Sequence, residues 1–268
     1  MVLKRQALAD SVIGIGRRVE NLKAAAALGA IDRYVSDSAA AIRGADLVVL
    51  ATHVDAYERH LKEWGEILEA GAIVTDVGSV KGPLVGQCEA LVPQRAAFVG
   101  AHPIAGREKT GVAAGSVDLF QGARCILTPT PRTDPQALQT VRGLWEAAGS
   151  TVSLMDPFAH DWVLGAVSHL PHVAAFSLVN ALSEVQDRLT DVNLLGFSGG
   201  GLRDTTRIAA SSPEMWRDIF VWNRENLVKL IEAYERHLAR LKQLIAAGDG
   251  PGIEKELARA KQVREQLR

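Results

Sequence analysis

The chain has 268 residues, 47% of them hydrophobic, and is long enough to bury a substantial core. Its 30 Lys and Arg and 31 Asp and Glu leave a net charge of −1, which argues against a nucleic-acid-binding protein. No apolar run approaches the roughly 20 residues of a membrane span, and the segment from Met1 to Ser11 has no apolar signal-peptide core. Two cysteines, Cys88 and Cys125, cannot build a disulfide framework, so we expect a cytoplasmic protein.

The first half of the chain alternates short apolar runs with helical stretches. The runs predict strands at Val12–Gly16, Leu47–Thr52, Ile73–Asp76, Phe98–Gly100, Cys125–Thr128 and Thr151–Leu154. The stretches between them predict helices at Val19–Leu28, Asp55–Leu68, Val80–Leu91 and Pro135–Ala148, the last with Asp134 as its N-cap. Unbroken apolar runs suit strands covered on both faces, so we expect a Rossmann-like, doubly wound α/β domain over residues 1–155.

After about Met155 the pattern becomes helical. Helices are expected at Pro157–Leu182, Asp218–Gln243 and Ile253–Leu267, with a glycine-rich break at Ser198–Gly201. The last part of the chain, from Glu225, is amphipathic and is expected to pack in the core or in a dimer interface. The sequence therefore predicts an all-helical domain over residues 156–268.

The glycines near the N-terminus do not form a complete nucleotide-binding motif. A dinucleotide-binding domain opens with a strand, a Gly-x-Gly-x-x-Gly turn and a helix whose N-terminus receives the pyrophosphate. Gly14-Ile-Gly16 is followed by Arg-Arg-Val, so the third glycine is absent. We therefore interpret Val12–Gly16 as the second strand of the domain, with the first strand and the phosphate turn upstream of Met1.

The end of this strand suggests which cofactor is used. An acidic residue at the end of the second strand favours NAD, whereas arginine accommodates the 2′-phosphate of NADP. Gly16 occupies the usual acidic position, and Arg17 and Arg18 follow it. This pattern predicts NADP over NAD, with NAD possible; in the alternative, the two arginines are merely solvated.

Residues suited to chemistry gather in a few clusters. Thr75–Lys81 lies at the end of a predicted strand, the edge where open α/β sheets bind ligands. Gly100–Gly111 places His102 in a loop bounded by glycines, and histidine beside basic residues suits acid–base work on an anionic substrate. Arginines suit carboxylates because their planar fork can donate two hydrogen bonds at once. No His, Asp and Glu set has the spacing of a metal site.

From about Val12 to its end, the chain resembles the prephenate/arogenate dehydrogenases (cyclohexadienyl dehydrogenases) of tyrosine biosynthesis. The resemblance rests on motifs in matching order and spacing: Asp76-x-Gly-Ser-x-Lys81, His102-Pro-Ile-Ala-Gly-x-Glu108, Ser168-His-Leu-Pro-His172, Gly199-Gly-Gly-x-x-Asp-x-Thr-Arg207 and Met215-Trp216-x-Asp218. A single such motif would be weak evidence, but all of them in register make a chance match very improbable.

The resemblance implies NAD(P)-dependent oxidative decarboxylation of prephenate to 4-hydroxyphenylpyruvate, of arogenate to tyrosine, or both. Hydride leaves the ring carbon that bears the hydroxyl, and the ring carboxylate departs as carbon dioxide. His102, in its neutral form, would take up the hydroxyl proton, and Ser79 would orient that hydroxyl or the nicotinamide. Arg207 would bind a substrate carboxylate, with His172 and Ser168 lining the site.

The resemblance also implies contacts around this centre. Glu108 and Arg203 would form an ion pair that gates the site or binds the substrate side chain. The cofactor is expected to contact Gly16, Arg17, Arg18, Thr52, Asp76 and Gly78. We expect a homodimer formed through the C-terminal helices, with no nucleic acid, membrane or metal partner.

Some of these residues have simpler explanations. Ser79 could cap a helix that starts near Val80, and Arg207 could form a structural ion pair with Asp204 or Asp218. His169 would face another side of its helix than Ser168 and is expected to be structural. No role is expected of His60, His160 or His237. The sequence gives no physical account of His53, at a position where the resembling proteins often have proline.

Two other functions stay open at this point. Without the first strand and the phosphate turn, the chain could be a catalytically silent helical dimer, since the sheet would lose a central strand. Another two-domain hydroxyacid dehydrogenase ranks last, because that class lacks the Ser168–His172 and Gly199–Arg207 motifs. Prephenate and arogenate differ by a keto or amino group, which the sequence does not discriminate.

Overall fold

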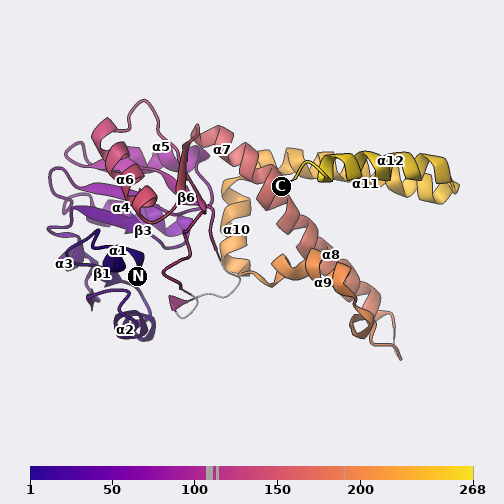
Figure 1. Cartoon of the computed structure of the whole chain (residues 1–268), viewed down its shortest axis with the longest axis horizontal. Coiled ribbons are helices and arrows are strands. Elements are labelled where there is room, and N and C mark those ends of the chain that lie inside the picture. Colours follow the sequence, from indigo (N-terminus) through magenta and orange to yellow (C-terminus); the bar gives the residue numbers. More distant parts are fainter. Residues whose placement is uncertain (107–110, 113–114, 190, 268) are drawn as a thin grey trace. The chain divides into compact units, whose positions relative to one another are not determined.

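The computed structural model describes residues 1–106, 111–112, 115–189 and 191–267 (Figure 1). The chain divides into two compact units, Met1–Asn223 and Arg224–Arg268. The first unit contains the α/β sheets and also the helices up to Asn223. The change from strands to helices lies between Leu154, the last strand residue, and Pro157.

Parallel strands form the first two sheets. β1 (Ile13–Ile15) pairs with β2 (Arg33–Val35). β3 (Leu47–Leu50), β4 (Ile73–Asp76) and β5 (Ala97–Val99) form a second sheet in that order. Among the described strands, β1 and β3 are not hydrogen-bonded neighbours, so these two sheets are not joined.

A third sheet departs from the purely parallel arrangement. β6 (Ala101–Pro103) runs antiparallel to β7 (Arg124–Leu127), which pairs in parallel with β8 (Thr151–Leu154). Gly100 separates β5 from β6, and a Cβ atom there would lie 2.5 Å from the Thr128 hydroxyl. A side chain at Gly100 would therefore clash unless a neighbour moved. The antiparallel pairing of β6 with β7 is not revealed by the apolar pattern.

The helices of the α/β part agree with most of the predicted ones. They are α1 Val2–Arg5, α2 Val19–Ala27, α3 Ser38–Ile42, α4 Tyr57–Trp64, α5 Gly82–Leu91 and α6 Pro135–Ala147, with a 3-10 turn η1 at Val54–Ala56. The predicted cap of α6 is confirmed, because Asp134 accepts a hydrogen bond from the Ala137 N–H at 2.8 Å. β2, α3 and β6 were not predicted, and all are short. His102, expected in a loop, is in fact the middle residue of strand β6.

After β8, all regular structure in the described part of the chain is helical. It contains α7 Pro157–Leu164, a π-helical turn Gly165–His169, α8 Leu170–Asp187, α9 Gly200–Thr206, α10 Pro213–Trp222, α11 Arg224–Ala247 and α12 Gly250–Arg264, with 3-10 turns η4 Leu194–Phe197 and η5 Arg207–Ala210. The helix predicted over Asp218–Gln243 is in fact interrupted at Asn223. In the second unit, α11 and α12 contact each other and are joined by a turn with Gly248 at φ 64°.

By length and composition alone, the helical segment Pro157–Asp187 is long and apolar enough to cross a membrane, whereas the sequence predicted no membrane span. Its buried polar residues argue for a protein environment. His160, Asp161 and His169 are all buried, and His160 and Asp161 are hydrogen-bonded to residues of the α/β sheets and their loops. Large apolar side chains are exposed elsewhere along it: Phe158, Trp162, Val163, Val167, Leu178, Val179 and Val185.

Two apolar cores fix the strand ends. The first packs β3, β4 and β5 against α4 and α5, and it includes Trp216 and Ile219 of α10. The second lies between β5–β7 and α6, with Val141 and Trp145 among its members. β4 belongs to the first core and β6 to the second. Polar groups gather where the carboxyl end of β4 meets the start of β6.

Candidate active site

A buried ion pair between Asp76 and Lys81 fixes the loop that follows β4. Asp76 Oδ2 accepts hydrogen bonds from Lys81 Nζ at 2.7 Å and from the Gly78 N–H at 2.8 Å, while Oδ1 accepts one from the Ala101 N–H at 2.9 Å. Lys81 also donates to the Gly78 carbonyl at 2.6 Å, and both charged side chains are 0% exposed. The pair therefore holds the loop against the beginning of β6, one residue before His102.

Gly78 lets this loop approach the end of β3. A Cβ atom at this position would lie 2.7 Å from Val54 Cγ1 and 2.9 Å from Asp76 Oδ2. Val54 begins η1, directly after β3. The ends of two adjacent parallel strands thus come together at the edge of the sheet where α/β proteins bind ligands.

His102 is joined to a second histidine and a carboxylate. His102 Nδ1 lies 2.9 Å from His160 Nε2, and His160 Nδ1 lies 2.8 Å from Asp161 Oδ1. Asp161 in turn accepts hydrogen bonds from the backbone N–H groups of Lys81 and Gly82, both at 2.7 Å. No role was expected of His160, and this geometry corrects that expectation: helix α7 delivers it to His102.

Both histidines are held neutral by their surroundings. Burial, with the Lys81 charge as the next largest cause, lowers the pKa of His102 well below its usual value. Burial also lowers the pKa of His160, although the hydrogen bond to Asp161 opposes this. The contact between His160 and Asp161 is therefore a hydrogen bond from a neutral ring rather than an ion pair. A neutral His102 can accept a proton.

Asn223 connects the network to the π-helical turn. Its Nδ2 donates to the Asp161 carbonyl at 2.8 Å and to His169 Nδ1 at 2.9 Å. His169 is 1% exposed, and burial lowers its pKa to about 4. Its Nε2 has no hydrogen-bond partner among the residues that the structure describes.

His172 lies about one helical turn after Ser168. His172 Nδ1 donates to the Ser168 carbonyl at 2.9 Å, and the His172 ring stacks on Trp216 with centroids 3.6 Å apart. Burial lowers the pKa of His172. The hydrogen bond to Ser168 and the stacking on Trp216 therefore fix the His172 ring. Nδ1 is used by the hydrogen bond, and Nε2 takes no part in it.

The remaining predicted residues, the catalytic Ser79 and the substrate-binding Arg203, Arg207 and Glu108, lie elsewhere in the chain. Ser79 is half-buried in the loop after β4, and it does not cap a helix: α5 begins at Gly82, and Asp161 accepts from its first N–H groups. Arg203 and Arg207 are exposed on α9 and η5, with Arg203 donating to the Ser198 carbonyl at 3.2 Å. Glu108, the predicted partner of Arg203, lies outside the described residues.

The predicted cofactor residues are divided between exposed and buried positions. Gly16, Arg17 and Arg18 are exposed after β1, and Thr52 is exposed after β3. Asp76 differs from the expectation, because it is fully buried and both of its oxygens are engaged within the protein. We therefore assign Asp76 to holding the loop rather than to direct contact with a nucleotide.

His53 finds a physical account in the structure. Its Nδ1 lies 3.4 Å from Asp218 Oδ2, and its side chain is 42% exposed. Asp218 is buried on α10, and its other oxygen accepts hydrogen bonds from Arg217 at 2.6 and 2.8 Å. His53 thus lies within ion-pair distance of α10, the helix that carries Trp216, while Asp218 Oδ2 makes no hydrogen bond to the described residues.

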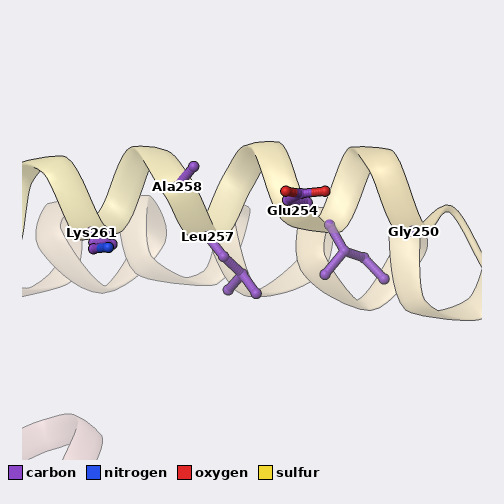
Figure 2. A pocket seen from close by; sticks show the side chains of 6 residues that line it. Gly250, Glu254, Leu257, Ala258 and Lys261 are labelled. Carbon is purple, nitrogen blue, oxygen red and sulfur yellow. The ribbon is translucent and has the colours of Figure 1, made fainter.

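A shallow hollow along α12 has no comparable chemistry (Figure 2). Its lining is mainly apolar or small, with Glu254 and Lys261 as its charged members. The lining residues are Gly250, Ile253, Glu254, Leu257, Ala258 and Lys261. None of the predicted site residues belongs to this helix.

Comparisons with known proteins agree with the motifs. Residues 1–154 match the family model described as prephenate dehydrogenase, nucleotide-binding domain, and residues 156–259 match prephenate dehydrogenase, dimerization domain. The prephenate dehydrogenase of Bacillus subtilis is 34% identical over 268 residues, covering 100% of this chain and 72% of the relative. The cyclohexadienyl dehydrogenase of Zymomonas mobilis is 35% identical over 226 residues, covering 84% of this chain and 76% of the relative.

Solved structures give the same result. Prephenate dehydrogenase from Aquifex aeolicus superposes with a TM-score of 0.92 and 39% identity, covering 99% of this chain and 94% of that one. A structure of the A. aeolicus enzyme with hydroxyphenyl propionate and NAD+ gives 0.91 and 40%, covering 100% and 92%. Synechocystis arogenate dehydrogenase gives 0.79 and 28%, covering 100% and 94%. The chain therefore belongs to the prephenate dehydrogenase family, with the nucleotide-binding domain of that family followed by its dimerisation domain.

Proposed function

We propose that this protein catalyses the NAD(P)-dependent oxidative decarboxylation of prephenate, of arogenate, or of both. Family membership supports the reaction, and the buried His102 in β6, joined to His160, is the observation that carries it. The nicotinamide cofactor supplies the acceptor for the hydride that leaves the ring carbon. Loss of the ring carboxylate as carbon dioxide leaves an aromatic ring, which drives the step forward.

His102 is the proposed general base. As hydride leaves, the ring hydroxyl becomes a carbonyl and must lose its proton, which a neutral imidazole can accept. Burial and the Lys81 charge keep His102 neutral at physiological pH, so it is ready for this task. Ser79, in the adjoining loop, is proposed to orient the hydroxyl or the nicotinamide.

The helical residues are proposed to hold the substrate. Arg207 suits a carboxylate because its guanidinium can donate two parallel hydrogen bonds. His172 keeps Nε2 for a ligand, since its Nδ1 donates to the Ser168 carbonyl. Arg203 is proposed to act with Glu108 on the substrate side chain.

The exposed residues at the strand ends are proposed to hold the cofactor. Arg17 and Arg18 are exposed cations that suit a phosphate, and Thr52 and Gly78 follow neighbouring parallel strands. The related A. aeolicus structure contains NAD+. The preference for NADP rests on Gly16 in the usual acidic position and on the two arginines beside it.

The unjoined sheets bear on cofactor binding. In a dinucleotide-binding sheet of order 3-2-1-4-5-6, the first strand separates the second from the fourth. If β1 and β2 are strands two and three, one strand between β1 and β3 would join the described sheets. The unjoined sheets are the observation that favours the alternative function, a catalytically silent helical dimer.

The dimerisation domain is proposed to pair two copies of the chain through its helices. The apolar side chains exposed on α7 and α8 are of the kind that a second copy would cover. Sedimentation equilibrium would test this, with a monomer at micromolar concentration counting against it.

One experiment tests the reaction and the cofactor together. Reduction of NADP and of NAD is followed with prephenate and, in parallel, with arogenate, and nucleotide binding is measured by calorimetry. Turnover with either substrate would establish the reaction, and the ratio of rates would give both preferences. A folded dimer that binds neither nucleotide would support the silent alternative, whereas nucleotide binding without turnover on either substrate would refute the proposed reaction.

A further inference from the structure

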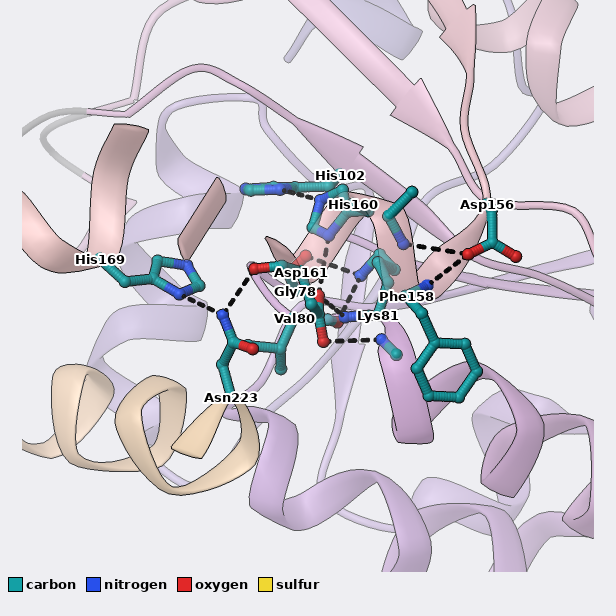
Figure 3. A network of polar contacts seen from close by, with 12 residues as sticks. Gly78, Val80, Lys81, His102, Asp156, Phe158, His160, Asp161, His169 and Asn223 are labelled. Carbon is teal, nitrogen blue, oxygen red and sulfur yellow. Dashed lines mark hydrogen bonds and ion pairs between the residues drawn. The ribbon is translucent and has the colours of Figure 1, made fainter. Parts of the chain in front are cut away.

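We propose that His160 and Asp161 are positioning residues that hold His102 with its proton on Nδ1, leaving Nε2 as the atom that receives the substrate proton. The inference rests on the proposed function of His102 as the base. It follows from counting donors and acceptors along the chain of contacts in Figure 3.

The count begins at the carboxylate of Asp161. Its two oxygens accept hydrogen bonds from the backbone N–H groups of Lys81 and Gly82, which can only donate. An ionised carboxylate is acceptor-only, so the contact at 2.8 Å requires a proton on His160 Nδ1. His160 therefore donates toward Asp161.

The same count then fixes His102. A neutral imidazole that carries its proton on Nδ1 has only a lone pair on Nε2. The 2.9 Å contact between His160 Nε2 and His102 Nδ1 is a hydrogen bond only if His102 donates. Since His102 is neutral as well, its own Nε2 is left with a lone pair. An unconstrained neutral imidazole prefers the opposite tautomer, so the network imposes this one.

The position of His102 Nε2 agrees with this role. Among the residues that the structure describes, none donates or accepts a hydrogen bond at this atom. The atom lies at the end of the ring away from His160 (Figure 3), in a residue that is 8% exposed. A substrate hydroxyl can meet a lone pair there rather than a competing N–H group.

The network also suits the protonated state. When Nε2 of His102 receives a proton, the positive charge is stabilised through His160 by the Asp161 carboxylate. The other charged groups nearby are the Lys81 ammonium and the Asp76 carboxylate, which neutralise each other, and His169 faces the group from the π-helical turn. Asp161 is thus the carboxylate left to balance an imidazolium, as in hydrolase triads, where a carboxylate orients the histidine.

Two substitutions of His160 separate orientation from mere packing. His160→Gln can place an amide oxygen where Nε2 lies and so can still accept from His102, whereas His160→Phe keeps a buried ring but offers no acceptor. Asp161 is left intact, because it also accepts from the first N–H groups of α5. His60→Gln serves as the matched control, since His60 stacks on Trp64 outside the network.

We expect His160→Phe to lower kcat by about 10²- to 10⁴-fold, the usual contribution of an oriented acid–base group, with little change in KM. His160→Gln should recover part of this loss, and His60→Gln should retain full activity. Equal kcat in the Phe variant and the wild type would overturn the inference, as would a Gln variant no better than a folded Phe variant.

A second readout does not depend on turnover. Long-range ¹H–¹⁵N correlation spectra of the resting protein report which ring nitrogen of each histidine carries a proton, and His102→Asn assigns the signal. A proton on Nδ1 of His102 in the wild type, lost or redistributed in His160→Phe, is the expected result. A proton on Nε2 in the wild type would overturn the inference. If the wild type turned over neither substrate, the reaction would be refuted while the spectra still decided the tautomer.

Discussion

Substitution of His169 by asparagine should reduce the loss of unfolding free energy that the protein undergoes as the pH is lowered. Burial lowers the pKa of His169 from 6.5 to about 4. Between these values the unfolded chain binds a proton that the native protein does not, so stability falls as the pH falls. A difference of this size corresponds to roughly 3 kcal/mol of unfolding free energy, lost progressively as the pH is lowered from 6.5 to 4.

Asparagine is the appropriate replacement because its Oδ1 can accept the hydrogen bond that Asn223 donates to His169 Nδ1. The variant loses ring packing against Trp216, so its absolute stability at neutral pH is not the quantity of interest. Urea unfolding at a fixed protein concentration, repeated between pH 7.5 and 4.5, gives the pH dependence of each protein. His237→Asn, at an exposed position on α11, is the control.

We expect the wild-type curve to fall more steeply below pH 6.5 than that of His169→Asn. The two should diverge by a few kcal/mol towards the acid end of the series. His102 and His160 also have lowered pKa values and keep some acid sensitivity in both proteins. Parallel curves for the two proteins would refute the argument, because His169 would then bind its proton equally in the folded and unfolded states.

Three further substitutions test other parts of the site. His102→Asn should lower kcat by about 10²-fold or more with substrate binding nearly intact, and steady-state kinetics with near-normal turnover would contradict the mechanism. Lys81→Met leaves the Asp76 carboxylate buried without its partner and should cost about 3–5 kcal/mol in urea unfolding; a loss below about 1 kcal/mol would show that the pair is dispensable. Arg207→Ala should weaken substrate binding by roughly 2–5 kcal/mol, measured by calorimetry, and unchanged affinity would assign the substrate carboxylate to another residue.

The sequence carries much of the fold because the relevant signals are local. Apolar runs locate β3 and β4, and the Asp134-Pro pair locates the start of α6 to the residue. β2, α3 and β6 escaped prediction because they are short and have weak patterns. The antiparallel pairing of β6 with β7 joins two separate stretches of chain, which no periodicity records.

The site was predictable only where a motif lies in one stretch of chain. His102 stands out by its own surroundings, but its partner His160 lies 58 residues away and meets it only in the folded protein. An adjacent His-Asp pair one turn into a helix was the available signal, and it is a weak one. Asp76 was placed correctly at a strand end, yet the sequence does not reveal that Lys81 folds back to cover it.

The π-helical turn at Gly165–His169 has a consequence for the length of the chain. An α-helix advances by about 100° per residue, so in a regular helix His160 and His169 would point in opposite directions. One extra residue in the turn shifts the helical phase by about 100° and returns His169 towards the direction of His160. Deleting Val167, which is 68% exposed, would remove the extra residue, and a regular helix would then keep His169 towards Asn223; a regular helix that retained Val167 would instead turn His169 away by about 100°. At that position the number of residues, rather than the identity of the side chain, sets whether the turn is π-helical.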